Sequence, residues 1–172
     1  MAVSSDILRT WRNPRAVMRG LLDMGRREDR ALMIVMVGCF LIFIAQWPRL
    51  SRTSAGFGTG GGDAPELSQL VAYEFFAWLL IWPLLLYFIG SVLHVIAKAA
   101  GGKGSFYSAR LALFWAVLAT TPAALLYGLC AGFLGPVLGT QITGLIYAAA
   151  FFAIFGACFY EAEKAAEGTP HV

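Results

Sequence analysis

The sequence contains few charged residues and few histidines or cysteines. Asp, Glu, Lys and Arg make up 13% of its 172 residues, about half of the ~25% that a soluble domain carries. The fifty residues from Leu111 to Tyr160 include none of these four types. One bilayer crossing requires only ~20 apolar residues. The shortage of charge therefore argues against a soluble globular domain and predicts a chain that crosses a membrane.

The shortage of histidine and cysteine limits the chemistry that the chain can perform. His94 and His171 are the two histidines, and the sequence has neither a His-Glu-x-x-His zinc motif nor a Gly-x-Ser-x-Gly nucleophile turn. The three cysteines fall at different expected depths in the membrane, which disfavours a disulfide. We expect no enzymatic activity, no cofactor and no metal site.

Long hydrophobic runs predict an all-α fold, a polytopic membrane helix bundle with four transmembrane helices. Pro136 and the surrounding glycines mark a turn within the charge-free stretch. Pro83 and Pro122 lie near the middles of the second and third spans, where we expect each to bend its helix. The expected organisation is an amphipathic cytoplasmic segment, a four-span domain and a cytoplasmic tail, at residues 1–30, 31–160 (spans 31–48, 71–97, 108–133 and 138–160) and 161–172.

The distribution of basic residues predicts the orientation. Placing both termini in the cytoplasm leaves eleven Lys and Arg inside and two, Arg49 and Arg52, outside. The net charge of +3 then reflects this asymmetry and does not indicate nucleic-acid binding. The first 30 residues are too charged for a cleavable signal peptide and too acidic for a mitochondrial transit peptide. We expect a multi-pass protein of the bacterial inner (cytoplasmic) membrane.

The N-terminal segment has one apolar face and one arginine-rich face. Asn13 and Pro14 interrupt it and suit the cap and first residue of a second helix. This composition is typical of an amphipathic helix that lies on an anionic membrane surface. The expected lipid contacts are Arg9, Trp11, Arg12 and Arg19. The alternative, that the segment packs on the cytoplasmic ends of the protein's own spans, is the less favoured one.

A glycine-rich turn joins the second and third spans. Gly101, Gly102, Lys103, Gly104 and Ser105 resemble a phosphate-binding loop, but a glycine follows the lysine where Ser or Thr would ligate magnesium. We interpret the segment as a tight cytoplasmic turn whose glycines adopt positive φ and whose serine caps the next helix.

Two further patterns lie within the spans. Glu74 and His94 are the only candidates for charged residues within the apolar core of the spans, and twenty helical residues separate them by ~30 Å, so they should lie at opposite membrane faces. Small residues at four-residue spacing predict close helix contacts, either inside the bundle or with a partner helix. These residues are Gly128, Gly132, Gly144 and Ala148.

The segment from His94 to Pro122 reads HVIAKAAGGKGSFYSARLALFWAVLATTP and resembles the signature of the Yip1 family. In that family an apolar span ends in Gly-Gly-x-Gly-Ser-Phe, a helix with a small and a basic residue follows, and a proline lies mid-span. NPRAVMRGLLD, from Asn13 to Asp23, is similar to the Pro-containing helix that precedes the family's first span. The resemblance implies a polytopic, non-enzymatic membrane protein.

These patterns favour a structural or organising role, or interaction with another protein, in the membrane. The expected partners are membrane lipids and another membrane protein or a second copy of this chain, with no nucleic acid. One alternative is an accessory or assembly subunit of a larger energy-converting complex. Another is a small transporter or channel that uses the bent second and third spans.

Overall fold

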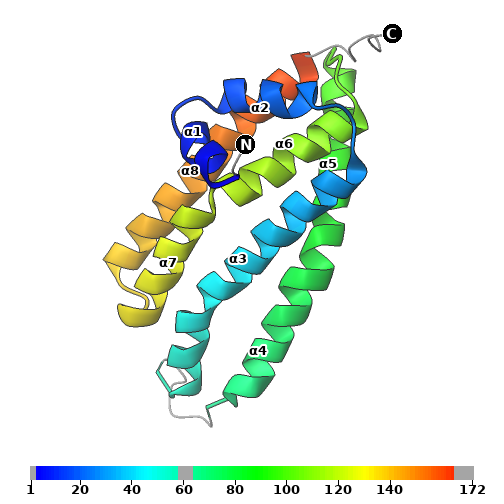
Figure 1. Ribbon diagram of the computed structural model, residues 1–172. Coiled ribbons are helices and arrows are strands. Elements are labelled where there is room, and N and C mark those ends of the chain that lie inside the picture. Colours follow the sequence, from blue (N-terminus) through cyan, green and yellow to red (C-terminus); the bar gives the residue numbers. More distant parts are fainter. Residues whose placement is uncertain (1–2, 58–63, 165–172) are drawn as a thin grey trace.

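The computed structural model describes residues 3–57 and 64–164, and these residues form helices without strands. The all-α prediction is therefore confirmed for this part of the chain. The helices follow one another as shown in Figure 1: α1 (Val3–Thr10), α2 (Pro14–Asp23), α3 (Glu28–Ser54), α4 (Leu67–Phe76), the π-helical turn η1 (Ala77–Ile81), α5 (Trp82–Ala99), α6 (Phe106–Ala119), α7 (Thr121–Phe133) and α8 (Leu138–Lys164).

Three of these helices are long and apolar enough to cross a membrane: α3, the continuous α4–η1–α5 helix, and α8. A fourth span results if α6 and α7 are counted as one helix bent by 45°. The helices extend past several predicted boundaries. α3 begins at Glu28 and continues through Pro48 to Ser54, and α8 continues to Lys164. Residues 161–164, predicted as tail, are therefore helical, and the rest of that tail lies outside the described residues.

The two mid-span prolines behave differently. The predicted bend at Pro122 is confirmed, because α6 ends at Ala119 and α7 leaves it at 45°. At Pro83, by contrast, the helix is not interrupted and runs from Leu67 to Ala99, so the expected bend there stays a prediction. The π turn η1 ends at Ile81, two residues before Pro83. This wider turn accommodates a carbonyl that the proline ring would otherwise meet in a regular α-helix.

Helix α6 fills the centre of the bundle. Twelve of its 14 residues are buried, among them Phe114 and Trp115. It packs on α3, α5 and α8, and α1 touches it as well. A helix that is apolar on nearly all sides is buried on nearly all sides, and the other helices direct their core residues toward α6. The middle of the molecule is therefore occupied by side chains of α6.

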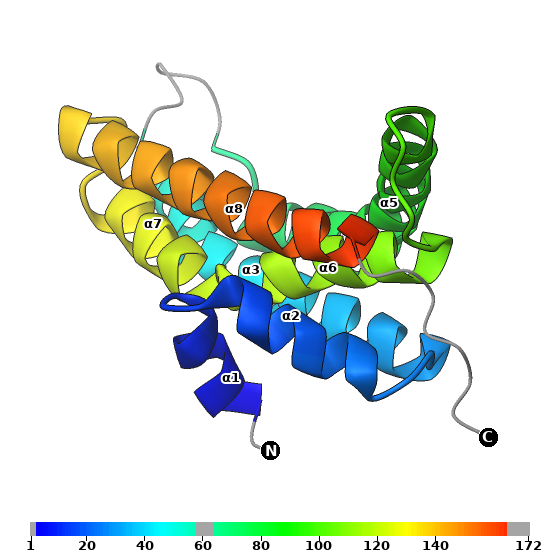
Figure 2. The same ribbon diagram turned by 90° about the horizontal axis from the view of Figure 1, so that it is seen from above.

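We term the end at which α3 and α6 begin and α5 and α8 end the proximal end, and the opposite end the distal end (Figure 1). The N-terminal helices lie towards the proximal end, and Figure 2 shows α2 running beside α8. As predicted, Asn13 caps α2 by accepting a hydrogen bond from the Ala16 N–H at 3.3 Å, and Pro14 is the first residue of the helix.

The apolar face of α2 packs against the protein. Met18 and Leu21 are buried within the common core. The preferred interpretation, in which this apolar face lies on the membrane surface, is therefore wrong for these two residues. Their side chains contact the protein, as the alternative predicted. An apolar groove on the bundle removes apolar side chains from water as effectively as a bilayer surface does.

Helix α1 is fastened to the bend between α6 and α7. The indole N–H of Trp11 donates to the Ala119 carbonyl oxygen at 2.9 Å. In the opposite direction, the indole N–H of Trp115 donates to Thr10 Oγ1 at 3.0 Å. The bend leaves carbonyl groups without partners in the following helix, and Trp11 supplies a donor to one of them.

Candidate functional site

The turn between α5 and α6 begins with a single glycine in the left-handed region. Gly101 has φ +91°, whereas Gly102 and Gly104 do not have positive φ. The expectation of positive φ at all three glycines is thus correct only for Gly101. At Gly102 and Gly104, glycine is required because there is no space for a Cβ atom. A Cβ atom on Gly102 would lie 2.6 Å from Glu163 Oε2, and one on Gly104 would lie 2.6 Å from the Ala162 carbonyl oxygen.

The turn ends in a helix cap, as predicted. Ser105 Oγ accepts a hydrogen bond from the Ser108 N–H at 3.2 Å, and Ser108 Oγ accepts from the Ser105 N–H at 2.8 Å. This reciprocal arrangement satisfies two backbone donors at the start of α6. The side chain of Lys103 is exposed, which places it away from the buried part of the turn.

A buried ionisable pair lies beneath this turn. His94 Nδ1 of α5 is 2.8 Å from Glu163 Oε1 of α8, and the two side chains are only 3% and 9% exposed. The ring of Phe106 packs edge-on against the imidazole, with centroids 4.5 Å apart. The Lys103 N–H donates to the Glu163 carbonyl oxygen at 2.9 Å. The pair and the turn together fasten the last residues of α8 to α5 and α6.

The second carboxylate oxygen of this pair has no partner. Glu163 Oε2 is buried and accepts no hydrogen bond from any described residue. It lies against the backbone of Gly102 and Gly104, since a Cβ on either glycine would come within 3.0 Å of it. We refer to this position between the two glycines as the glycine seat. A buried oxygen without a donor is rare, because burial removes the water that would solvate it.

Sequence reasoning missed this pair because it placed His94 at a membrane interface and residue 163 in a tail. One signal could have revealed it. Both residues fall at the proximal ends of their helices, α5 and α8, so they lie at the same depth. A histidine in an otherwise apolar helix requires a polar partner at that depth. Glu74 does lie at the opposite, distal end, where Arg49 Nη2 is 2.7 Å from its Oε1.

Other charged groups tie the N-terminal segment to the proximal end. Arg30 Nη2 donates to the Gly25 carbonyl oxygen at 2.8 Å and to Tyr107 Oη at 3.2 Å. Arg110 Nη2 of α6 lies 2.8 Å from Glu28 Oε1 of α3. These contacts span the α2–α3 connection and the start of α6. The segment is therefore anchored by polar contacts in addition to its apolar face.

The four predicted lipid contacts remain partly or fully accessible. Arg12 and Trp11 are exposed, although the Trp11 indole is engaged with α6. Arg9 lies 3.8 Å from Asp6, and Arg19 lies 3.2 Å from Glu161 of α8. Two of the three arginines are thus paired with carboxylates, and the side chains of all four predicted residues remain at the surface.

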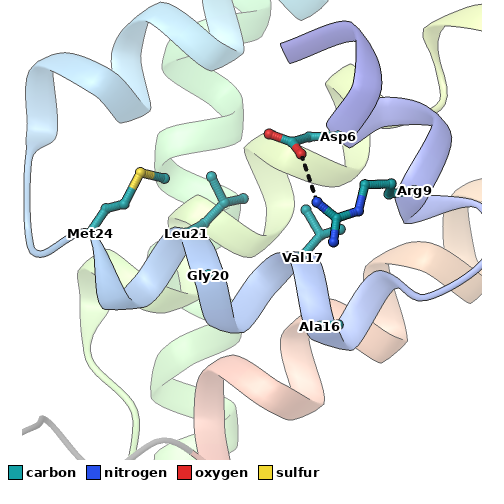
Figure 3. A pocket seen from close by; sticks show the side chains of 7 residues that line it. All are labelled: Asp6, Arg9, Ala16, Val17, Gly20, Leu21 and Met24. Carbon is teal, nitrogen blue, oxygen red and sulfur yellow. Dashed lines mark ion pairs between the residues drawn. The ribbon is translucent and has the colours of Figure 1, made fainter. Parts of the chain in front are cut away.

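A small cleft of about 150 Å³ separates α1 from α2. Figure 3 shows the carboxylate of Asp6 facing the guanidinium of Arg9 at its rim, with Val17 and Leu21 on the α2 side. Gly20 leaves its wall open, because a Cβ there would meet no atom within 4 Å. The cleft is bounded by the N-terminal helices alone and contains none of the buried ionisable groups.

The predicted small residues bring helices of this chain together. A Cβ on Gly128 would overlap the Ala45 carbonyl oxygen of α3, and one on Gly132 would overlap Pro48. Gly144 of α8 lies against the ring of Tyr127 of α7. Ala148 is half-buried in α8. Gly128, Gly132 and Gly144 therefore serve contacts inside the bundle.

No group of three or more His, Cys, Asp or Glu in residues 3–57 and 64–164 is arranged to hold a metal ion. Comparisons of the chain with protein-family models, curated proteins and solved structures found no match. The resemblance to the Yip1 family stays a prediction. The His94–Glu163 pair with its glycine seat is the strongest candidate for a functional site, because it combines burial, charge and an unpartnered oxygen.

Proposed function

We propose that this chain is a non-enzymatic, Yip1-like integral membrane protein that associates with another membrane protein. It crosses a bacterial inner membrane four times, with α6 and α7 as one bent span, and both termini are cytoplasmic. The proximal end is then the cytoplasmic end. In support, that end holds eleven of the 13 basic residues, and the positive-inside rule favours this orientation.

The observation that carries the proposal is that α4 and η1 bury no residue in this chain. The segment is nevertheless rich in aromatic side chains, and Tyr73, Phe76 and Ile81 are 60–74% exposed. It belongs to a helix that packs mainly on α3 and α6. Protein interfaces are enriched in aromatic residues, so this surface suits a helix of a partner protein.

The filled centre of the bundle favours this function over transport. Side chains of α6 occupy the position where a transporter would need a polar path, and Phe114 and Trp115 are both almost completely buried there. Intramembrane pathways for ions or protons are usually lined by ionisable residues. The two charged candidates of the α4–η1–α5 helix lie at opposite ends of the bundle, with Glu74 paired to Arg49 at the distal end and His94 at the proximal end.

The exposed arginines support a second element of the proposal, contact with anionic lipid. Arg9 of α1, Arg12 of the turn that follows it and Arg19 of α2 are exposed at the surface. Each basic residue near an anionic leaflet contributes ~1 kcal/mol of attraction. In this arrangement the apolar face of α2 packs against the protein's own helices, while the arginines face the lipid headgroups.

Photo-crosslinking in native membranes tests the interaction surface. The photoreactive analogue p-benzoylphenylalanine replaces Phe76 of α4 in one variant and Phe152 of α8 in a matched control, since these side chains are 62% and 67% exposed. We expect a discrete protein adduct from position 76 and mainly lipid adducts from position 152. Lipid adducts alone at position 76 would overturn the assignment of this surface.

Reporter fusions test the orientation. Alkaline phosphatase, which is active only outside the cytoplasm, should be active when fused after Gly58 and inactive when fused after Gly102. The reverse pattern would contradict the four-span topology. Ion or solute flux in liposomes that contain the purified protein would instead support the transporter alternative.

A further inference from the structure

We propose that His94 and Glu163 form a proton-dependent latch that fastens the end of α8 to the turn between α5 and α6. Three contacts hold the latch closed. His94 Nδ1 lies 2.8 Å from Glu163 Oε1, the Lys103 N–H donates to the Glu163 carbonyl oxygen at 2.9 Å, and Glu163 Oε2 occupies the glycine seat. The inference concerns the chain itself and does not depend on the partner proposed above.

The charge of the pair depends on one exchangeable proton. When the pair holds this proton, it is neutral overall, either as imidazolium with carboxylate or as imidazole with carboxylic acid. When the proton leaves, a neutral imidazole and a carboxylate remain, and the site carries one net negative charge. The side chain of Glu163 is only 9% exposed. Burial of an uncompensated charge is strongly unfavourable.

The glycine seat makes this charge harder to stabilise. Among the described residues no N–H or O–H donates to Glu163 Oε2. A protonated carboxyl group, by contrast, could donate from this oxygen to a carbonyl of the seat. The Ala97 and Ala162 carbonyl oxygens border Gly102 and Gly104. The seat therefore fits the neutral pair and disfavours the deprotonated pair.

Charged groups on the surrounding elements compensate little. Arg110 of α6 is paired with Glu28, and Arg19 of α2 is paired with Glu161 of α8. The remaining cations on α5, the turn and α8 have exposed side chains, and solvent screens charges at such positions. They are Lys98, Lys103 and Lys164.

Deprotonation should open the latch locally. Glu163 is the second-to-last residue of α8. Fraying of one helical turn would therefore carry its carboxylate to water. This movement breaks the backbone hydrogen bond from Lys103 and uncovers Ala162, which is completely buried in the closed state. Helix ends open more readily than helix centres. The rest of the bundle can remain folded.

Thiol accessibility tests the latch in the full chain, purified in detergent. The variant Ala162→Cys, made with the native cysteines replaced by alanine, reports opening. Ala100→Cys, at an exposed position of the same turn, corrects for the rise in thiol reactivity with pH that any exposed cysteine shows. The ratio of the two maleimide-labelling rates should rise at least about tenfold from about pH 6 to about pH 9.

The substitution Glu163→Gln provides the decisive control. Its amide keeps the shape of the side chain, can accept from His94 and can donate to a carbonyl of the seat, but it carries no charge. The labelling ratio should then stay low and independent of pH. A wild-type ratio that does not change with pH would overturn the proposal, as would a Glu163→Gln variant with the wild-type pH profile.

Hydrogen exchange provides a second measurement if Ala162→Cys does not fold. The Lys103 amide donates a hydrogen bond to the Glu163 carbonyl oxygen. At high pH its exchange rate should rise by more than the rate of an unprotected amide does. This excess should disappear in Glu163→Gln. Equal protection in both proteins across the pH range would contradict the latch.

Discussion

Three neighbouring residues of the α5–α6 turn should respond to alanine in three different ways. Gly101 has positive φ but open space around its Cα, so Gly101→Ala strains only the backbone. Gly102→Ala directs a methyl group at Glu163 Oε2 and at the Ala97 carbonyl oxygen, 2.6 and 3.0 Å from the new Cβ. Lys103→Ala removes an exposed side chain and keeps the backbone N–H that bonds to Glu163.

The expected magnitudes follow from these surroundings. An L-residue in the left-handed region costs ~1–2 kcal/mol, which applies to Gly101→Ala. Overpacking of a tight site typically costs ~1–3 kcal/mol, and Gly102→Ala should fall in the upper part of this range because it also pushes Glu163 away from His94. Lys103→Ala should change the free energy of unfolding by less than ~0.5 kcal/mol.

Thermal unfolding in detergent, followed by the height of the main peak in size-exclusion chromatography, measures these differences. Each kcal/mol corresponds to ~2–4 °C in Tm for a chain of this length. A double-mutant cycle identifies the cause, since Glu163→Ala removes the atom that the new methyl group meets. Gly102→Ala should therefore cost less in the Glu163→Ala background.

Two outcomes would refute this reasoning. One is a Gly102→Ala protein with wild-type Tm, which would mean that the glycine seat is not closely occupied. The other is a larger loss from Lys103→Ala than from Gly102→Ala, above all if the purified protein bound ATP or GTP through Lys103. The turn would then act as a phosphate-binding loop and not as a structural junction.

Further substitutions test contacts elsewhere in the bundle. Trp11→Phe removes the donor to the α6 carbonyl and should lower the free energy of unfolding by ~1–3 kcal/mol; Trp47→Phe, at a tryptophan of similar exposure (46% against 44%), should have little effect on Tm. Gly128→Ala should force α7 away from α3 and lower the yield of monomer, whereas Gly156→Ala, which has open space around it, should be neutral or slightly stabilising. Arg12→Gln should reduce the anionic lipid that copurifies with the protein, measured by lipid mass spectrometry, without changing Tm; an unchanged lipid content would argue against headgroup contact at this residue.

Local features of this fold are predictable because they depend on neighbouring residues. Asn13 with Pro14, and Ser105 with Ser108, lie within one helical turn of the groups that they cap. The sequence alone therefore identifies both helix starts. The bend at Pro122 follows in the same way from the missing proline N–H and its ring.

The candidate site is harder to predict because its residues come from distant parts of the chain. His94 and Glu163 are 69 positions apart, and neither belongs to a motif that names the other. Gly102 and Gly104 carry a recognisable signal, but sequence reasoning assigned it to backbone conformation. The structure shows that the space beside Glu163 is what excludes a side chain at both positions.

The N-terminal segment shows why amphipathicity does not distinguish lipid from protein as the apolar environment. Both surfaces remove Met18 and Leu21 from water, so the hydrophobic pattern is the same in either case. Polar contacts of fixed geometry distinguish them. Trp11 donates to the Ala119 carbonyl at the α6–α7 bend, and Thr10 accepts from Trp115. A fluid bilayer surface offers no partners at fixed positions, whereas the bend between α6 and α7 does. The α6–α7 bend thus presents the Ala119 carbonyl oxygen that holds α1 in place, and this coupling depends on the tertiary structure.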